Sequence, residues 1–313
     1  MTERAGERFA FLPEGRTVLS ISGPDRVAFL QGLVSNDVAK AGCERALWCA
    51  FLTPQGKYLH DFFLVGHRRH DGSGEDELLL DVEAGRAPDL LKRLKLYRLR
   101  SKVELAELRD GWTVALAYGD GALEALELPE APGAARPWHG GTAFVDPRLA
   151  AAGARLLLPR AGAEVGLAGA GFALSGAAEW DRRRLALGLP DGSRDLEIEK
   201  TTLLEAGFDE LGAIDWQKGC WMGQELTART RYRGLVKRRL LPVALGGGAE
   251  PGTAITAGGK EVGTLRSVEG DRGLALLRLE ALEAGSLEAG GVTVEPRVPD
   301  WAAIQRPAAA KGA

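Results

Sequence analysis

The sequence predicts an α+β protein that ends in a small antiparallel β-barrel. Up to Tyr118, strand-like segments alternate with two helix-like segments, an order typical of ferredoxin-like units rather than of a doubly wound parallel sheet. After Gly234, short strand-like segments follow one another between glycine-rich turns, which is typical of a barrel. We therefore expect an α+β region over residues 1–237, made of two ferredoxin-like subdomains with a boundary near residues 110–140, and a barrel domain over residues 238–313.

Local patterns predict the first strands and the first helix. Residues 17–21 form a β-branched and aliphatic run, and the turn after them places Pro24 where a helix can begin. Apolar residues then recur every three or four positions over residues 27–34, as expected for an amphipathic helix. Residues 46–52 and 58–65 read as a hairpin, because the segment between them holds a proline and a glycine that favour a turn.

The remaining elements follow from the same patterns. Helices are expected over residues 88–99 and 177–187, and strands over residues 78–82, 101–108 and 112–118. Barrel strands are expected over residues 235–245, 253–256, 260–268, 273–279 and 292–294. Residues 67–77 and 161–171 read as loops, residues 120–141 as a connector with one weak helix, and residues 306–313 as a tail with too few large apolar groups to order itself.

Composition narrows the class of protein. The chain has 313 residues, with 40 basic and 43 acidic side chains and a net charge of −3, so no overall field draws it to nucleic acid or to a membrane surface. Its three cysteines, Cys43, Cys49 and Cys220, are few and odd in number, which favours a reducing compartment without structural disulfides. No apolar run approaches the roughly 18 residues that span a bilayer. We expect a soluble cytoplasmic protein.

The segment with the most distinctive chemistry surrounds Cys220. Gly219 and Gly223 flank this cysteine, and glycines let the backbone take angles closed to other residues and let a ligand approach closely. Lys218 beside the thiol, and a helix start just after it, both favour a thiolate over a thiol. A reactive cysteine is therefore reasonable, although a small buried filler is the commoner fate of an unpaired cysteine.

The same segment continues into a basic stretch. Gln224 and Glu225 suit the first turn of a helix that Gly234 can end. The basic residues that follow are Arg229, Arg231, Arg233, Lys237, Arg238 and Arg239. This stripe leaves open an RNA-binding or tRNA-modification-associated function, although no aromatic stacking platform accompanies it.

Other charged residues lie at positions that need an explanation. Asp61 separates two apolar stretches, which is unusual for a carboxylate unless it points into a site or pairs with a base. We interpret His60 before it as a surface or hairpin residue. His67 and His70 have no third ligand at a suitable spacing, so we expect no metal site there. Arg184 lies on a predicted helix with two further arginines, whose guanidinium groups suit carboxylates, unless this is simply a solvated basic face.

The stretch from Lys218 to Glu225, followed by Leu-Thr-Ala-Arg-Thr and a glycine with a basic cluster, resembles the signature of the YgfZ family. These folate-binding proteins are relatives of the glycine-cleavage T-protein and support iron–sulfur cluster assembly or repair. Further segments resemble the family in the expected order, and together they cover most of the chain: residues 23–38, 146–148, 153–156, 184–190 and 204–205, and the barrel.

The resemblance implies a T-protein-like folate-binding fold, tetrahydrofolate or a derivative as cofactor, and iron–sulfur client or assembly proteins as partners, without a membrane or nucleic-acid partner. It makes Cys220, Lys218 and Asp61 the candidate catalytic residues, with Cys220 at a central cleft. The candidate folate-binding residues are Arg148, Arg155, Arg184, Gly219, Gln224, Glu225, Arg229 and Arg233.

Two departures from the T-protein bear on activity. The T-protein has a pair of aspartates where this chain has His60 and Asp61, and a pterin-binding glutamate near the strand that here carries Arg155. We therefore do not expect aminomethyl transfer, since losing a positioned carboxylate typically costs about a hundredfold or more in rate. A folate-dependent aminomethyl- or methyltransferase remains the alternative.

Overall fold

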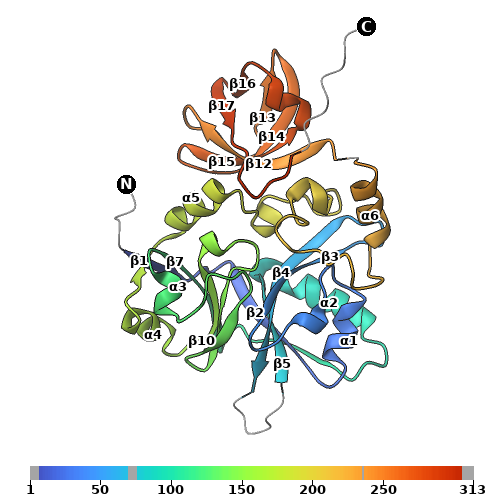
Figure 1. The fold of residues 1–313 in the computed structure, drawn as a ribbon, viewed down its shortest axis with the longest axis vertical. Coiled ribbons are helices and arrows are strands. Elements are labelled where there is room, and N and C mark those ends of the chain that lie inside the picture. Colours follow the sequence, from blue (N-terminus) through green and yellow to red (C-terminus); the bar gives the residue numbers. More distant parts are fainter. Residues whose placement is uncertain (1–6, 70–75, 235, 305–313) are drawn as a thin grey trace. The chain divides into compact units, whose positions relative to one another are not determined.

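The computed structural model describes residues 7–69, 76–234 and 236–304 (Figure 1). The chain forms two compact units, and it passes between them more than once. Unit 1 comprises the described residues within 1–52, 59–177 and 212–222, and unit 2 comprises those within 53–58, 178–211 and 223–313. The domain division predicted at residue 237 stays a prediction.

Unit 1 contains two sheets. The first sheet has the strand order β3 (Ala46–Leu52), β4 (Tyr58–Arg68), β5 (Asp76–Glu83), β2 (Arg16–Ser22) and β6 (Glu104–Glu107). The second has the order β11 (Ala173–Leu174), β1 (Arg8–Phe11), β7 (Trp112–Gly119), β10 (Ala154–Pro159), β9 (Gly141–Val145) and β8 (Ala135–Trp138). The helices of this part are α1 (Arg26–Gln31), α2 (Ala87–Tyr97), α3 (Ala122–Ala125) and α4 (Ala163–Gly169).

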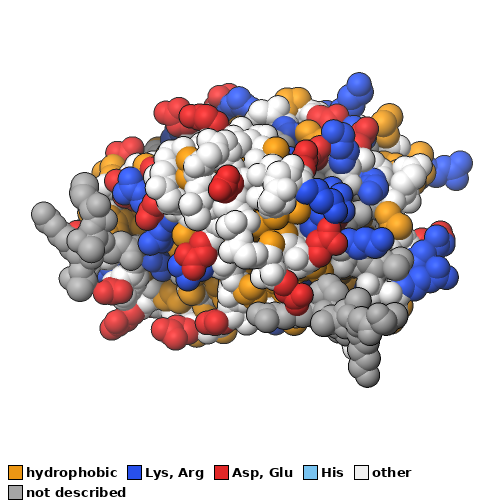
Figure 2. Space-filling model, turned by 90° about the horizontal axis from the view of Figure 1, so that it is seen from above, with side chains coloured by type: hydrophobic (Ala, Val, Ile, Leu, Met, Phe, Trp, Pro, Cys, Tyr) orange, Lys and Arg blue, Asp and Glu red, His pale blue; other side chains and the backbone are white. Residues whose placement is uncertain are grey.

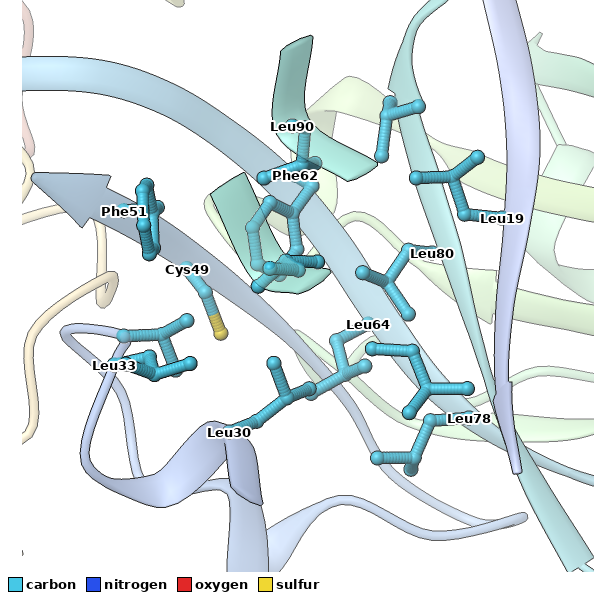
Figure 3. Packing of buried hydrophobic residues seen from close by; sticks show 14 of the residues in the cluster. Leu19, Leu30, Leu33, Cys49, Phe51, Phe62, Leu64, Leu78, Leu80 and Leu90 are labelled. Carbon is cyan, nitrogen blue, oxygen red and sulfur yellow. The ribbon is translucent and has the colours of Figure 1, made fainter. Parts of the chain in front are cut away.

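The two faces of the first sheet have different chemistry. Because successive side chains of a strand point to opposite faces, Cys49, Phe62 and Leu80 lie in an apolar cluster with α1 and α2, whereas Phe63 and Asp81 belong to the other face. Figure 3 shows the Cys49 sulfur pointing among the aliphatic side chains of this cluster. The second face carries the charged groups described below.

Unit 2 contains a closed six-stranded barrel, α5 (Ala177–Leu187) and α6 (Gln224–Tyr232). The barrel order is β12 (Arg238–Leu245), β15 (Arg272–Arg278), β14 (Lys260–Glu269), β13 (Ala254–Ala257), β16 (Leu287–Ala289) and β17 (Val292–Pro296), and every pairing within it is antiparallel. The barrel has its own apolar core, which includes Ile255, Leu265 and Leu277. The predicted α+β architecture with a C-terminal antiparallel barrel is therefore confirmed.

Several predicted elements need correction. The expected loop at residues 161–171 contains α4, whose Ala163 and Leu167 are buried. Strands β4 and β5 extend to Arg68 and from Asp76, so the predicted loop at residues 67–77 begins too early and ends too late. Strands β1, β8, β9, β11 and β16 were not predicted. The predictions for His70, Leu235 and residues 306–313 fall outside the described residues. Within the part of the chain that is described, no helix has the length and apolar character to cross a bilayer.

Candidate functional site

Cys220 lies on a loop of unit 1 that is fixed on both sides. Before it, the Lys218 ammonium donates hydrogen bonds to the backbone carbonyls of Val34, at 2.7 Å, and of Asn36. After it, Trp221 is 5% exposed, and the Met222 amide donates to the carbonyl of Gly32 at 3.1 Å. Cys220 itself is exposed. The loop therefore presents the thiol outward from an anchored backbone.

The two glycines of this loop have the backbone angles that the sequence predicted. Gly219 has φ +84° and Gly223 has φ +83°, values that side chains other than glycine rarely adopt. A Cβ added at Gly219 would meet no atom within 4 Å, so the backbone next to Cys220 is open to an approaching group. Gly223 is the residue before α6.

The three cysteines differ in environment. Cys49 is fully buried, and this burial raises the pKa of its thiol to about 12. Cys43 is partly buried, which also raises the pKa of its thiol. Only Cys220 among the three is exposed, and thiolate chemistry requires access as well as charge. Among the described residues, no group of three or more His, Cys, Asp or Glu side chains is arranged to hold a metal ion.

Lys218 is held by its anchoring contacts. Burial lowers the pKa of its ammonium to about 8, against the opposing effects of Cys49, Asp37 and Asp215. Two backbone carbonyls accept its hydrogen bonds. In the structure, Lys218 fixes the loop through these hydrogen bonds. A chemical role for Lys218 at Cys220 stays a prediction.

His60 and Asp61 lie on opposite faces of β4, because neighbouring residues of a strand alternate. Asp61 is buried and accepts a hydrogen bond from the Trp48 indole Nε1 at 2.9 Å. His60 is 4% exposed, with Nε2 2.9 Å from Oδ2 of Asp89. His60 does lie in the predicted hairpin of β3 and β4. The predicted surface position is wrong, because the side chain is buried and α2 supplies its partner carboxylate. His60 and Asp61 therefore do not face the same bound molecule.

The imidazole of His60 is kept neutral by its surroundings. Burial, together with the charge of Arg86, lowers its pKa to about 4, against the opposing effect of Asp89. Arg93 donates to the same Asp89 carboxylate at 2.8 Å, so this carboxylate has a second, permanently charged partner. The arrangement suits a structural hydrogen bond at neutral pH. His67 is likewise buried, with Nδ1 3.3 Å from the Thr142 hydroxyl, and not on a solvated loop as predicted.

Arg148 and Arg155 belong to a buried ion cluster within unit 1. Arg155 pairs with Asp81 at 2.7 Å and with Asp146 at 3.1 Å, and its guanidinium carbon lies 3.6 Å from the ring centroid of Phe63. Arg148 pairs with Asp146 at 2.8 Å. Although burial alone would raise the pKa of Asp146, the charges of both arginines hold it at about 2. Both guanidinium groups are thus occupied by carboxylates of the chain itself.

Arg184 is also internally paired. It is 1% exposed, and its guanidinium contacts Asp181 at 2.6 Å and Asp195 at 2.8 Å. Arg194 donates to the same Asp181 at 2.7 Å. Arg184 therefore does not lie on a solvated basic face. The carboxylates that it binds are two aspartates of the chain itself, which the sequence pattern did not identify.

The basic stripe is broken up by acidic partners. Arg229 pairs with Glu225 within α6, Arg238 pairs with Glu205 at 2.9 Å, and the buried Arg239 pairs with Glu210. Arg233 is exposed at the end of α6. On the face seen in Figure 2, Lys and Arg side chains gather toward one edge and are interspersed with Asp and Glu.

One feature of the loop was missed from the sequence. The Trp221 indole Nε1 is a buried donor that has no hydrogen-bond partner within the described residues. A buried donor of this kind costs free energy unless something accepts from it. The only sequence signal for it was the aromatic position that follows Cys220.

The fold and the barrel of this chain are similar to those of known proteins. Residues 237–304 match the family model described as CAF17, C-terminal beta-barrel domain. The crystal structure of the glycine cleavage system aminomethyltransferase T from Bartonella henselae superposes with a TM-score of 0.75 and 17% identity, over 95% of this chain and 87% of that protein. The chain therefore has an aminomethyltransferase T-like fold with a CAF17-type barrel, and the predicted T-protein-like fold is confirmed.

Relatives in sequence are named as assembly factors. The human iron–sulfur cluster assembly factor IBA57, mitochondrial, is 36% identical over 95% of this chain and 86% of the human protein. The mouse protein of the same name is 32% identical over 93% of this chain and 84% of its own length. The chain belongs to the IBA57 family of iron–sulfur cluster assembly factors.

These comparisons also test the functional expectations. The prediction of an iron–sulfur cluster assembly factor is confirmed at the level of the family, whereas the narrower assignment to the YgfZ family stays a prediction. The expected cytoplasmic location is wrong on this comparison, because the human and mouse relatives are named as mitochondrial proteins.

Proposed function

We propose that this iron–sulfur cluster assembly factor acts through the Cys220 thiol and that it binds a reduced folate. The observation that carries the proposal is the exposed thiol on a loop anchored by Lys218, Trp221 and Met222. A thiolate is both a soft nucleophile and a metal ligand. A fixed and accessible thiol therefore suits transient contact with iron or sulfur of a client protein.

A resident cluster is not part of this proposal. Iron–sulfur clusters are usually held by about four cysteine thiolates, and of the three cysteines here Cys49 lies in the apolar core. The iron or sulfur is accordingly a cargo that Cys220 contacts in a client or assembly partner.

The folate part depends on which residues fit the ligand. A reduced folate ends in a glutamate or polyglutamate tail, and guanidinium groups bind such carboxylates through paired hydrogen bonds. Arg148, Arg155 and Arg184 do not fit as tail ligands, because buried aspartates of the chain already hold them. Arg233 is exposed, and it makes no ion pair with a described residue. It therefore fits a tail carboxylate.

Arg229 also fits a tail carboxylate. Its ion pair with Glu225 is exposed on both sides, and such pairs are weak enough to exchange partners. When bound, a reduced folate supplies a carrier for a one-carbon unit. The exposure of Arg229 and Arg233 supports the folate proposal.

Titration with mono- and triglutamyl tetrahydrofolate, followed by tryptophan fluorescence, tests this binding. We expect the triglutamyl form to bind more tightly, and Arg233→Ala to reduce that advantage. Each charge-assisted hydrogen bond contributes about 1.5–3 kcal/mol before screening by salt. Equal binding of the two forms, or no binding, would contradict the folate part and leave the thiol part to be judged by the variant described at the end of the Discussion.

Neither alternative function is favoured by the geometry. Aminomethyl transfer loses support because a buried, neutral imidazole stands at one of the two aspartate positions, and Asp61 at the other accepts a hydrogen bond from the Trp48 indole. An RNA-binding module loses support because Arg238 and the buried Arg239 of the basic stripe are paired with glutamates, which interrupts the stripe.

A further inference from the structure

The C-terminal end of α2 carries an unusual concentration of exposed apolar side chains. Leu96 is 68% exposed, Tyr97 40% and Leu99 87%. All six residues from 95 to 100 are exposed, and we call this segment the α2 tip. Leu99 has φ +42°, a backbone region that costs free energy for a bulky residue. The fold therefore holds an apolar side chain in solvent at an energetic cost.

The same surface is positively charged. Lys92, Lys95, Arg98, Arg100 and Lys102 make no side-chain hydrogen bond or ion pair with any described residue. The acidic neighbours along the chain are Asp89, Glu104 and Glu107; Asp89 is shared by Arg93 and His60, and Glu107 pairs with Arg109. The local excess of positive charge contrasts with the net charge of −3 of the whole chain.

Two hollows flank the α2 tip within unit 1. One of about 530 Å³ is lined by Leu91, Leu96, Lys92 and Lys95, with Pro88 and Glu107. It combines an apolar floor with two ammonium groups. A second hollow of about 410 Å³ is lined by Arg98 and Lys102, among others. An apolar hollow beside ammonium groups fits aliphatic and acidic side chains that lie next to each other.

The neighbouring strand β6 lies at an edge of its sheet. It pairs with β2 on one side, and no strand of the described residues pairs with its other side. A free edge can accept an extended segment from another chain through backbone hydrogen bonds. The edge and the first hollow meet at Glu107, which belongs to β6 and lines the hollow.

We propose that the α2 tip, its two hollows and the edge of β6 dock an extended segment of a partner protein in which acidic and aliphatic residues alternate. The carboxylates meet the unpaired lysines and arginines, and the aliphatic side chains cover Leu96 and fill the hollow beside it. This surface is independent of Cys220 and of folate. It adds a docking function to the chemistry proposed for the thiol.

Selection of short random peptides on the intact protein tests the proposal. The test variant is Lys95→Glu with Leu96→Ser. The matched control is Lys260→Glu with Val165→Ser, which makes the same change of charge at an exposed lysine and an exposed apolar residue elsewhere. We expect the selected peptides to combine Asp or Glu with aliphatic residues and to bind the parent and the control equally. They should bind the test variant about tenfold more weakly or worse.

Two further measurements separate the possible occupants. Binding of the peptides should weaken as salt rises, and it should slow amide hydrogen exchange at residues 104–107. Vesicles of phosphatidylglycerol and a uridine oligonucleotide are tested alongside. The proposal is overturned if no peptide distinguishes the parent from the test variant, or if vesicles or the oligonucleotide make that distinction and peptides do not.

Discussion

His60 is held as a neutral imidazole inside unit 1, and this has a consequence for stability in acid. Its side chain is buried against Phe51 and contacts Asp89 through Nε2. Burial and the charge of Arg86 make protonation unfavourable in the folded state. In the unfolded chain the same imidazole is solvated and titrates normally.

The pKa of His60 is lowered from 6.5 to about 4 on folding. Between these pH values the unfolded chain binds more protons, so the stabilising contribution of neutral His60 is fully present above pH 6.5 and is lost as pH falls toward 4. We expect His60→Gln to remove about 2–3 kcal/mol of the acid sensitivity of unfolding. Urea unfolding at about pH 7 and about pH 4.5 measures this difference. If parent and variant lost the same free energy of unfolding between these two pH values, the acid sensitivity could not be assigned to His60.

Arg155 illustrates what the sequence could and could not predict at the scale of single residues. Its place on a strand was predictable, but its partners Asp81 and Asp146 are 74 and 9 positions away in the chain. Pairings over such distances depend on how two sheets meet, which no local pattern contains. The Cys220 loop was more predictable, because the positive φ of Gly219 and Gly223 follows from the glycines themselves.

At the scale of elements, glycine was the main source of error. Residues 161–171 were predicted as a loop because they hold four glycines, yet α4 spans most of them. A Cβ at Gly166 would lie 3.3 Å from the His139 ring and 3.4 Å from the Trp138 ring. This glycine permits close packing of α4 on β8 and its turn. By contrast, α5 has the bounds predicted for it, residues 177–187.

A pair of glycine substitutions tests this distinction between packing and flexibility. A Cβ at Gly141 would lie 2.0 Å from the carbonyl oxygen of Leu157, whereas a Cβ at Gly169 in α4 would meet nothing within 4 Å. We expect Gly141→Ala to lower the free energy of unfolding by about 2–4 kcal/mol. Gly169→Ala should raise it by about 0.5–1 kcal/mol, because alanine favours the helix. Urea unfolding of both variants measures whether the free energy of unfolding falls for Gly141→Ala and rises for Gly169→Ala. Destabilisation of similar size in both would contradict the distinction between packing and flexibility.

At the scale of the whole molecule, the two proposed functions use different parts of the chain and can be tested separately. The Cys220 loop and the α2 tip both belong to unit 1, but they use different chemistry, a thiol in one case and charge with apolar contact in the other. The α+β fold class could be predicted because strand-like and helix-like segments alternate along the sequence. The barrel could be predicted because short strand-like segments follow one another after Gly234. The division into two units did not, because the chain returns to each unit from distant segments.

In the proposed function, the Cys220 thiol performs the assembly chemistry. Serine nearly preserves the volume of the side chain, and an exposed position has little packing to lose. The melting temperature of Cys220→Ser should therefore stay within a few degrees of the parent, since about 1 kcal/mol shifts a domain of about 150–250 residues by about 2–4 °C. Cys43→Ser, the same substitution at a half-buried cysteine, is the matched control.

The most direct measurement is the activity of an iron–sulfur enzyme in cells that lack this protein and receive the parent, Cys220→Ser or Cys43→Ser at equal abundance. We predict that the parent and Cys43→Ser restore the activity and that folded Cys220→Ser does not. Full restoration by Cys220→Ser would contradict the account and remove the thiol from the mechanism.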